Sequence, residues 1–132
     1  MENLITPHFK FKEFACNDGA PVPEYLFYNM RMLAVNLEVI RAFVGRPIIV
    51  NSAYRTISHN TKVGGASQSQ HLHCNASDIH VKGMQPKELY NIIKSLMQRR
   101  AIEQGGLFLY DNFVHYDRRG IAIFRDYRKS KK

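Results

Sequence analysis

The segment spanning residues 69–80 concentrates side chains that are able to bind a metal ion. It contains three histidines, one aspartate and one cysteine, namely His71, His73, His80, Asp78 and Cys74. Imidazole nitrogens and carboxylate oxygens both bind zinc, at about 2.0–2.2 Å. Three such protein ligands leave a fourth position for a water molecule, whose pKa the metal lowers. The segment therefore allows a hydrolytic metal site, although a polar surface loop would contain the same residue types.

A second group of such residues lies at 113–118, where His115 and Asp117 are two residues apart. In a β-strand, side chains two residues apart lie on the same face. We therefore expect His115 and Asp117 to point to the same side of a sheet. The HExxH motif of helical zinc peptidases does not occur, and two cysteines are too few for a cysteine-rich structural zinc site.

Together these motifs resemble the zinc peptidases of family M15, subfamily A, the D-alanyl-D-alanine carboxypeptidase type. The signature of that family approximates Ser-x-His-x-x-Gly-x-Ala-x-Asp, followed by a later histidine on a strand. The matching residues are Ser69, His71, Cys74 in the glycine place, Ala76, Asp78 and His115. The segments 52–56 (Ser-Ala-Tyr-Arg-Thr) and 63–66 (Val-Gly-Gly-Ala) resemble flanking sequences of the family. The resemblance covers nearly the whole chain.

The resemblance implies roles for individual residues. The implied ligands of one Zn²⁺ ion are His71, Asp78 and His115. Arg55 is implied to lie in the cleft and to bind the terminal carboxylate or a carbonyl of the substrate, because a guanidinium forms two parallel charged hydrogen bonds. The alternative for Arg55 is a surface salt bridge. Ser69 is expected to support the site. We also expect Ser69 and Tyr110 to bind the substrate together with Arg55.

One departure from the family pattern concerns proton transfer. Many relatives carry a histidine or glutamate as general base two to five residues before the last zinc ligand, whereas residues 110–113 here are Tyr, Asp, Asn and Phe. Because Asp117 is expected on the same strand face as His115, we predict that Asp117 is the general acid/base. The alternative is that Asp117 orients a ligand or pairs with Arg118 or Arg119.

The sequence pattern also predicts the elements that must position these residues. Apolar residues at helical spacing predict a long helix over 23–45, closed by Gly45, and a second helix over 85–100. We expect strands at 47–52, 76–81, 107–110, 113–118 and 121–127, of which the first is buried and the last three form an antiparallel meander. The expected fold class is α+β, an antiparallel sheet with helices packed on one side and a zinc site in a cleft on the sheet.

The length and charge of the chain limit its organisation and partners. Its 132 residues fit a single domain spanning 1–132, with an aromatic lead-in segment at 1–22 and a basic tail at 128–132. The formal net charge of +8 favours contact with a polyanion such as an anionic cell-wall polymer. The sequence shows no signal-peptide pattern. It also has no apolar run that approaches the ~20 residues needed to span a membrane. We therefore expect synthesis in the cytoplasm, action on the wall after release, and no membrane partner.

The two cysteines do not form a disulfide framework and indicate synthesis in a reducing compartment. Cys74 stands where the family has glycine. If the backbone at Cys74 is left-handed, a residue with a side chain is strained there.

Three functions follow as hypotheses. The first is a zinc-dependent peptidase that hydrolyses D-amino-acid-containing bonds of bacterial peptidoglycan, as a D,D-carboxypeptidase or an endopeptidase of the phage-lysin kind. Its partner would be the stem peptide, and we expect a monomer. The second is a zinc-containing cell-wall binding module with weak catalysis, because the usual base is missing. Nucleic-acid binding is disfavoured, since the chain has no helix-turn-helix, RNP motif or zinc-finger spacing.

Overall fold

The computed structural model describes residues 3–129 and has an α+β fold, as the sequence predicts. In chain order the elements are β1 (Leu4–Thr6), β2 (Phe9–Lys10), α1 (Phe11–Phe14), η1 (Glu24–Leu26), α2 (Phe27–Val44), β3 (Ile49–Ser52), α3 (Ile57–Lys62), η2 (Gln70–His73), β4 (Ala76–His80), α4 (Pro86–Gln98), β5 (Gly106–Leu109), β6 (Val114–Asp117) and β7 (Ile123–Asp126). Within the predicted basic tail, residues 130–132 lie outside the described residues. No described helix combines the length and apolarity needed to cross a membrane.

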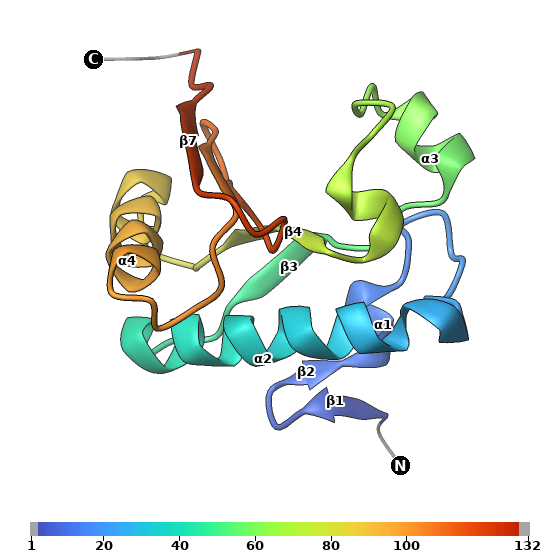
Figure 1. Ribbon diagram of the computed structural model, residues 1–132, viewed down its shortest axis with the longest axis horizontal. Helices are drawn as coiled ribbons and strands as arrows, with labels where there is room; N and C mark the ends of the chain where they lie inside the picture. The colour runs from blue at the N-terminus through green and yellow to red at the C-terminus, as the bar shows by residue number, and fades with distance from the viewer. Residues whose placement is uncertain (1–2, 130–132) are drawn as a thin grey trace.

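The main sheet has five strands in the order β3-β4-β6-β5-β7. Its two edge strands, β3 and β7, and the inner strand β4 are labelled in Figure 1. Neighbouring strands are antiparallel except β5 and β7, which are parallel. The predicted antiparallel meander over the last three strands is therefore wrong in its final step. The reason is that β6 already has β4 on one edge and β5 on the other, so the chain crosses the start of β5 and adds β7 at the free edge of β5.

Strand β3 lies at the opposite edge of this sheet, so the prediction of a buried first strand is also wrong. Its exposed and half-buried residues alternate, and Ile49 is 40% exposed. The apolar run before Asn51 contributes to the core mainly through Ile48, which precedes the strand and is buried. An edge strand needs only one covered side, whereas β4 is buried along almost its whole length.

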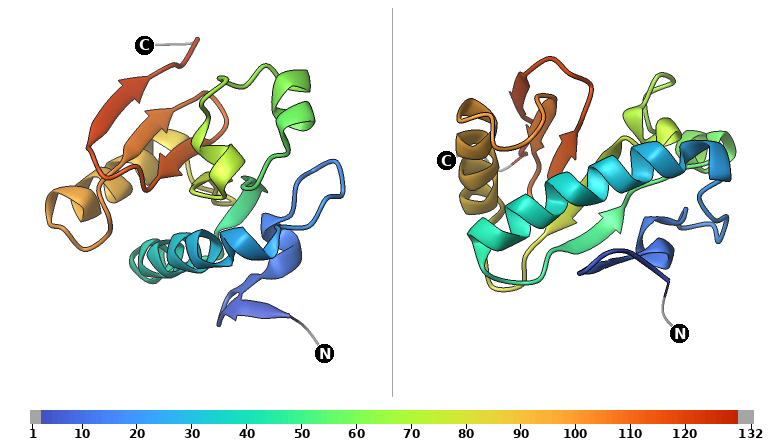
Figure 2. Two further views of the ribbon diagram at one scale, coloured as in Figure 1. Left: turned by 45° about the vertical axis from the view of Figure 1, so that its right-hand side comes forward. Right: turned by 60° about the horizontal axis from the view of Figure 1, so that its bottom comes forward.

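The two long helices form the layer behind the sheet. Helix α2 confirms the predicted apolar stripe and ends at Gly45, whose φ of 75° gives the left-handed C-cap that glycine favours. Helix α4 packs against β5 and β6 and also contacts α2 (Figure 2). The helix residues that are buried in the core are Met30, Leu33, Ala34, Leu37 and Ile40 from α2 and Leu89, Tyr90, Ile93, Leu96 and Met97 from α4.

The lead-in segment has structure that the sequence pattern does not predict. Strands β1 and β2 form a small antiparallel hairpin, and α1 follows it directly. The expected packing of its aromatic residues on the core is confirmed for Phe9 and Phe14, which are buried, and Phe11 packs at the margin. The irregular stretch between β3 and β4 likewise contains two short helices, α3 and η2.

A polar cluster on the core side of the sheet joins α2 to β6. Asn36 of α2 makes two hydrogen bonds to Glu103. Its Oδ1 accepts from the Glu103 backbone N–H (2.8 Å), and its Nδ2 donates to Glu103 Oε2 (2.9 Å). Arg118 donates from Nε to the same carboxylate at 2.7 Å, and the Tyr116 hydroxyl donates to the Glu103 carbonyl at 2.8 Å. Because Tyr116 and His115 are neighbours on β6, this cluster holds one face of the strand while His115 occupies the other.

We predict that Asn36→Ala lowers the free energy of unfolding by about 1–3 kcal/mol, because the Glu103 N–H loses its acceptor. Urea unfolding followed by circular dichroism measures this change. The matched control is Asn91→Ala, since Asn91 is an exposed residue of α4 and alanine is the better helix former. Equal stabilities for the two variants would contradict the importance of the cluster.

Candidate metal centre and cleft

Three side chains from separate elements meet on the face of the sheet opposite the long helices. Asp78 of β4 is paired in register with His115 of β6, and His71 comes from η2, just before β4. Asp78 Oδ1 lies 3.2 Å from His71 Nε2 and 3.0 Å from His115 Nδ1. The three candidate ligand atoms all lie within 4.8 Å of one another, and all three residues are buried. The structure thus brings together the three residues that the resemblance implies.

The outer nitrogen of each imidazole has a fixed partner. His71 Nδ1 donates to the carbonyl oxygen of Ala53 at 2.6 Å, since a carbonyl only accepts. His115 Nε2 donates to Asp117 Oδ2 at 2.7 Å. In neutral imidazoles these bonds leave the lone pairs of His71 Nε2 and His115 Nδ1 directed at Asp78. Outer partners of this kind are the usual companions of metal-binding histidines.

The charges of the cluster favour a cation at its centre. Burial raises the pKa of Asp78, but hydrogen bonds from His115 and His71 outweigh it, so the pKa of this carboxyl lies well below its usual range. Burial lowers the pKa of His115, yet hydrogen bonds to Asp117 and Asp78 raise it above its ordinary value. Buried lone pairs facing an ionised carboxylate need either protons or a metal ion between them. The nitrogen, oxygen and nitrogen donors fit zinc, whose binding would release those protons.

Asp117 lies behind His115, on the other ring nitrogen from Asp78. Its carboxylate also accepts from the backbone N–H of Gly106 (2.8 Å) and from Arg119 Nε (2.9 Å) and Nη2 (2.6 Å). Although burial raises the pKa of Asp117, hydrogen bonds from His115 and Arg119 hold it well below its usual range. The expectation that Asp117 shares a face with His115 is confirmed. This geometry favours the orienting role, because a fully buried carboxylate with these partners does not face the cleft.

Arg55 reaches the same centre from the segment after β3. Its Nη2 donates to Asp78 Oδ2 at 3.2 Å, and its Nη1 donates to Asn60 Oδ1 at 3.3 Å. Arg55 therefore lies in the cleft and makes its salt bridge with a candidate ligand rather than at the surface. Asn60 is buried and was not singled out from the sequence, where no spacing distinguishes it. A Cβ at Gly65 would collide with Asn60 Oδ1, so a side chain there would displace the Asn60 amide that Arg55 contacts.

Ser69 and Cys74 shape the turn that carries His71. Ser69 is the N-cap of η2, and its Oγ accepts from the His71 N–H at 3.1 Å. Cys74 ends this turn with φ 52° and ψ 38°, so it adopts the left-handed backbone considered for a residue at the glycine place. Burial raises the pKa of the Cys74 thiol to about 12, which keeps it protonated and unreactive. Both residues act on the backbone around His71.

A cleft of about 650 Å³ opens over the three candidate ligands. Phe108 stacks on the His115 ring with centroids 4.8 Å apart, and Tyr110 stacks on Phe113 at 4.6 Å. Tyr127, which follows β7, contacts Tyr110 and Phe108. Of these wall residues, only Tyr110 was expected from the sequence. Phe108 and Tyr127 were not, and Tyr127 reaches the cleft through the parallel pairing of β7 with β5. Among the described residues that line the cleft, the only carboxylate and imidazole groups are those of the three candidate ligands.

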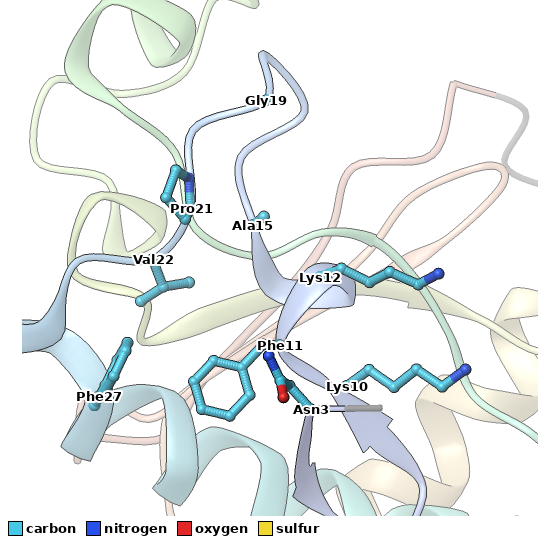
Figure 3. Close-up of a pocket in the computed structure, with 9 residues that line it drawn as sticks. All are labelled: Asn3, Lys10, Phe11, Lys12, Ala15, Gly19, Pro21, Val22 and Phe27. Atoms are coloured by element: carbon cyan, nitrogen blue, oxygen red, sulfur yellow. The ribbon is translucent and has the colours of Figure 1, made fainter. Parts of the chain in front are cut away.

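A second hollow lies between the lead-in segment and α2 (Figure 3). Its floor is apolar, with Phe11, Val22 and Phe27, and Lys10 and Lys12 extend along one side. Its lining includes no histidine, cysteine or carboxylate. Within the described chain, this hollow therefore offers none of the metal-binding groups that distinguish the cleft.

Comparison with known proteins agrees with the geometry of the cleft. A family model described as Peptidase M15 matches residues 7–117, which include all three candidate ligands and Asp117. The chain belongs to the M15 family of zinc peptidases. A search of curated proteins found no match.

We predict that Asp117→Asn weakens zinc binding at His71, Asp78 and His115 by roughly 10- to 100-fold, the usual cost of losing an outer partner. The amide no longer accepts a charged hydrogen bond from His115 Nε2, so the ring loses its fixed orientation. Zinc titration followed by the NMR signals of the His71 and His115 rings measures this site directly. Unchanged affinity in a folded variant would contradict the orienting role.

Proposed function

We propose that this protein is a zinc-dependent peptidase that hydrolyses D-amino-acid-containing peptide bonds in peptidoglycan. The observation that carries the proposal is the buried group of His71, Asp78 and His115, with both outer imidazole nitrogens fixed. Membership of the M15 family supports peptidase chemistry. The substrate class rests on the resemblance to D-alanyl-D-alanine carboxypeptidases, and the stem peptide of the wall is the proposed partner.

The side chains of the cleft have distinct proposed roles. His71, Asp78 and His115 would hold one zinc ion, which when bound supplies a Lewis acid and acidifies water. Arg55 donates hydrogen bonds to the terminal carboxylate or a carbonyl oxygen of the substrate, where its positive charge stabilises negative charge. Asp117 keeps the proton of His115 on Nε2 and so keeps Nδ1 free for the metal.

Two further residues are proposed to bind substrate. Burial raises the pKa of Tyr110, so its hydroxyl stays protonated and donates a hydrogen bond within the cleft. Ser69 lines the cleft itself and holds the adjacent turn through the bond that its Oγ accepts from the His71 N–H. The net charge of +8 favours approach to an anionic cell wall.

One observation favours a second candidate function, a zinc-containing binding module. The described lining of the cleft offers no carboxylate or imidazole beyond the three candidate ligands, so no separate general base lies there. Such a module would bind the same stem peptide without turning it over. Product release from peptidoglycan distinguishes the two functions.

We predict that His71→Ala, Asp78→Ala and His115→Ala each abolish release of cleavage products from purified peptidoglycan. Added zinc does not restore activity, because loss of a direct ligand costs more than the roughly 10- to 100-fold loss of an outer partner. The measurement is chromatography of soluble fragments, with and without chelator, and exposed His8→Ala serves as the matched control. A zinc-loaded wild-type protein that releases no fragments from several wall types would instead support the binding module.

We predict that Arg55→Lys lowers kcat/KM by about 10- to 100-fold, because lysine keeps the charge but loses the forked hydrogen bonds, each worth about 1.5–3 kcal/mol to a charged group. Steady-state kinetics on a stem-peptide substrate measure the effect. Zinc affinity at His71 and His115, followed by NMR, should change little. Wild-type kinetics in this variant would remove Arg55 from substrate binding.

A further inference from the structure

A second group of metal-binding side chains lies outside the cleft, where the loop after α1 meets α3. Cys16 and Asp18 belong to the loop, and His59 belongs to α3. Their Sγ, carboxylate oxygen and imidazole nitrogen all lie within 4.8 Å of one another. Figures 1 and 2 show the loop beside α3, although the two segments are some forty residues apart in the sequence. No sequence motif links these three residues.

Hydrogen bonds within the loop and to β3 fix the backbone that carries Cys16 and Asp18. The Cys16 N–H donates to the Ala20 carbonyl at 2.8 Å, and the Gly19 N–H donates to the Cys16 carbonyl at 2.9 Å. Gly19, which lies at the tip of the loop in Figure 3, has a φ of 99° that favours glycine. Asn17 Nδ2 donates to the Asn51 carbonyl of β3 at 3.0 Å and anchors the loop to the sheet. The two potential ligands are therefore positioned before any ion binds.

Thr56 connects this group to α3. Its Oγ1 donates to Asp18 Oδ2 at 2.8 Å, lies 3.9 Å from Cys16 Sγ and accepts from the His59 N–H at 3.2 Å. The hydroxyl thus touches all three residues. Cys16 is buried, His59 is half-buried and Asp18 is exposed, so the thiol is enclosed while an ion has a path from solvent along Asp18.

We propose that Cys16, Asp18 and His59 form a second metal site, for a divalent transition metal of the zinc class. A thiolate sulfur, an imidazole nitrogen and a carboxylate oxygen are the donors that zinc accepts in proteins. A thiolate and a carboxylate balance the two charges of the ion. Softer thiolate ligands also distinguish this site from the cleft, where the donors are nitrogen and oxygen only.

The bound ion would tie the loop to α3 and thereby support the cleft. Thr56 directly follows Arg55, and the segment after α3 supplies Gly64 and Gly65 to the cleft lining. An ion that binds the folded chain stabilises it through mass action. The role of the second site is therefore structural, and it does not depend on whether the cleft cleaves peptides.

Cobalt tests this proposal, because a thiolate bound to Co²⁺ gives a sulfur-to-metal charge-transfer absorption in the near ultraviolet and the ligands of the cleft do not. The whole, metal-free protein is titrated with Co²⁺ and its absorption recorded. We expect the band in the wild type and in Asp78→Ala, which removes a cleft ligand. Its presence in Asp78→Ala separates this proposal from the proposed function.

The matched variants are Cys16→Ala and Cys74→Ala, since both cysteines are buried and free. We expect Cys16→Ala to abolish the band and Cys74→Ala to keep it. His59→Ala, at a half-buried position, should weaken cobalt binding at least about tenfold and decides the matter if Cys16→Ala does not fold. No band in folded, cobalt-saturated wild type, or a band unaffected by both Cys16→Ala and His59→Ala, would overturn the proposal.

Discussion

The candidate metal centre depends on one electrostatic constraint, the meeting of two buried imidazoles on a single carboxylate oxygen of Asp78. Each imidazole gives its outer N–H to a fixed acceptor, Ala53 in one case and Asp117 in the other. The inner nitrogens are then acceptors facing an anion, which is unfavourable in a buried place unless a cation joins them. Protons on the inner nitrogens, or a zinc ion between the three residues, would remove this repulsion.

Several elements maintain that arrangement from outside. Pairing of β4 with β6 sets Asp78 opposite His115, and the Ser69-capped turn brings His71 beside them. The polar cluster around Glu103 holds the reverse face of β6 against α2. Gly106 and Arg119 fix Asp117. Helices and strands thus position the candidate ligands, while Arg55 and aromatic residues line the open side of the cleft. Binding sites commonly combine a rigid support with such an apolar and polar lining.

The sequence predicted the parts whose signal is local. The apolar stripe and Gly45 predicted α2, and the resemblance to the M15 family implied His71, Asp78 and His115 as candidate zinc ligands. Parallel pairing of β7 could not be predicted, because it depends on which sheet edge is still free once β4 has joined β6. The position of Asp117 behind His115 could not be predicted, because it depends on how the His115 ring is oriented. Strand alternation determines only which face of the sheet a side chain occupies. Asn60, Phe108 and Tyr127 reach the cleft through tertiary contacts that leave no periodic pattern.

The most direct test of the central claim is a crystal structure of the zinc-loaded protein, with anomalous diffraction recorded on both sides of the zinc absorption edge. We predict an anomalous peak for a zinc ion whose ligands are His71 Nε2, a carboxylate oxygen of Asp78 and His115 Nδ1. His115 Nε2 should still donate its hydrogen bond to Asp117. A fully zinc-loaded crystal without a peak between these three residues would contradict the account. Coordination through His115 Nε2 would contradict it equally, because Asp117 would then have no part in holding the metal site.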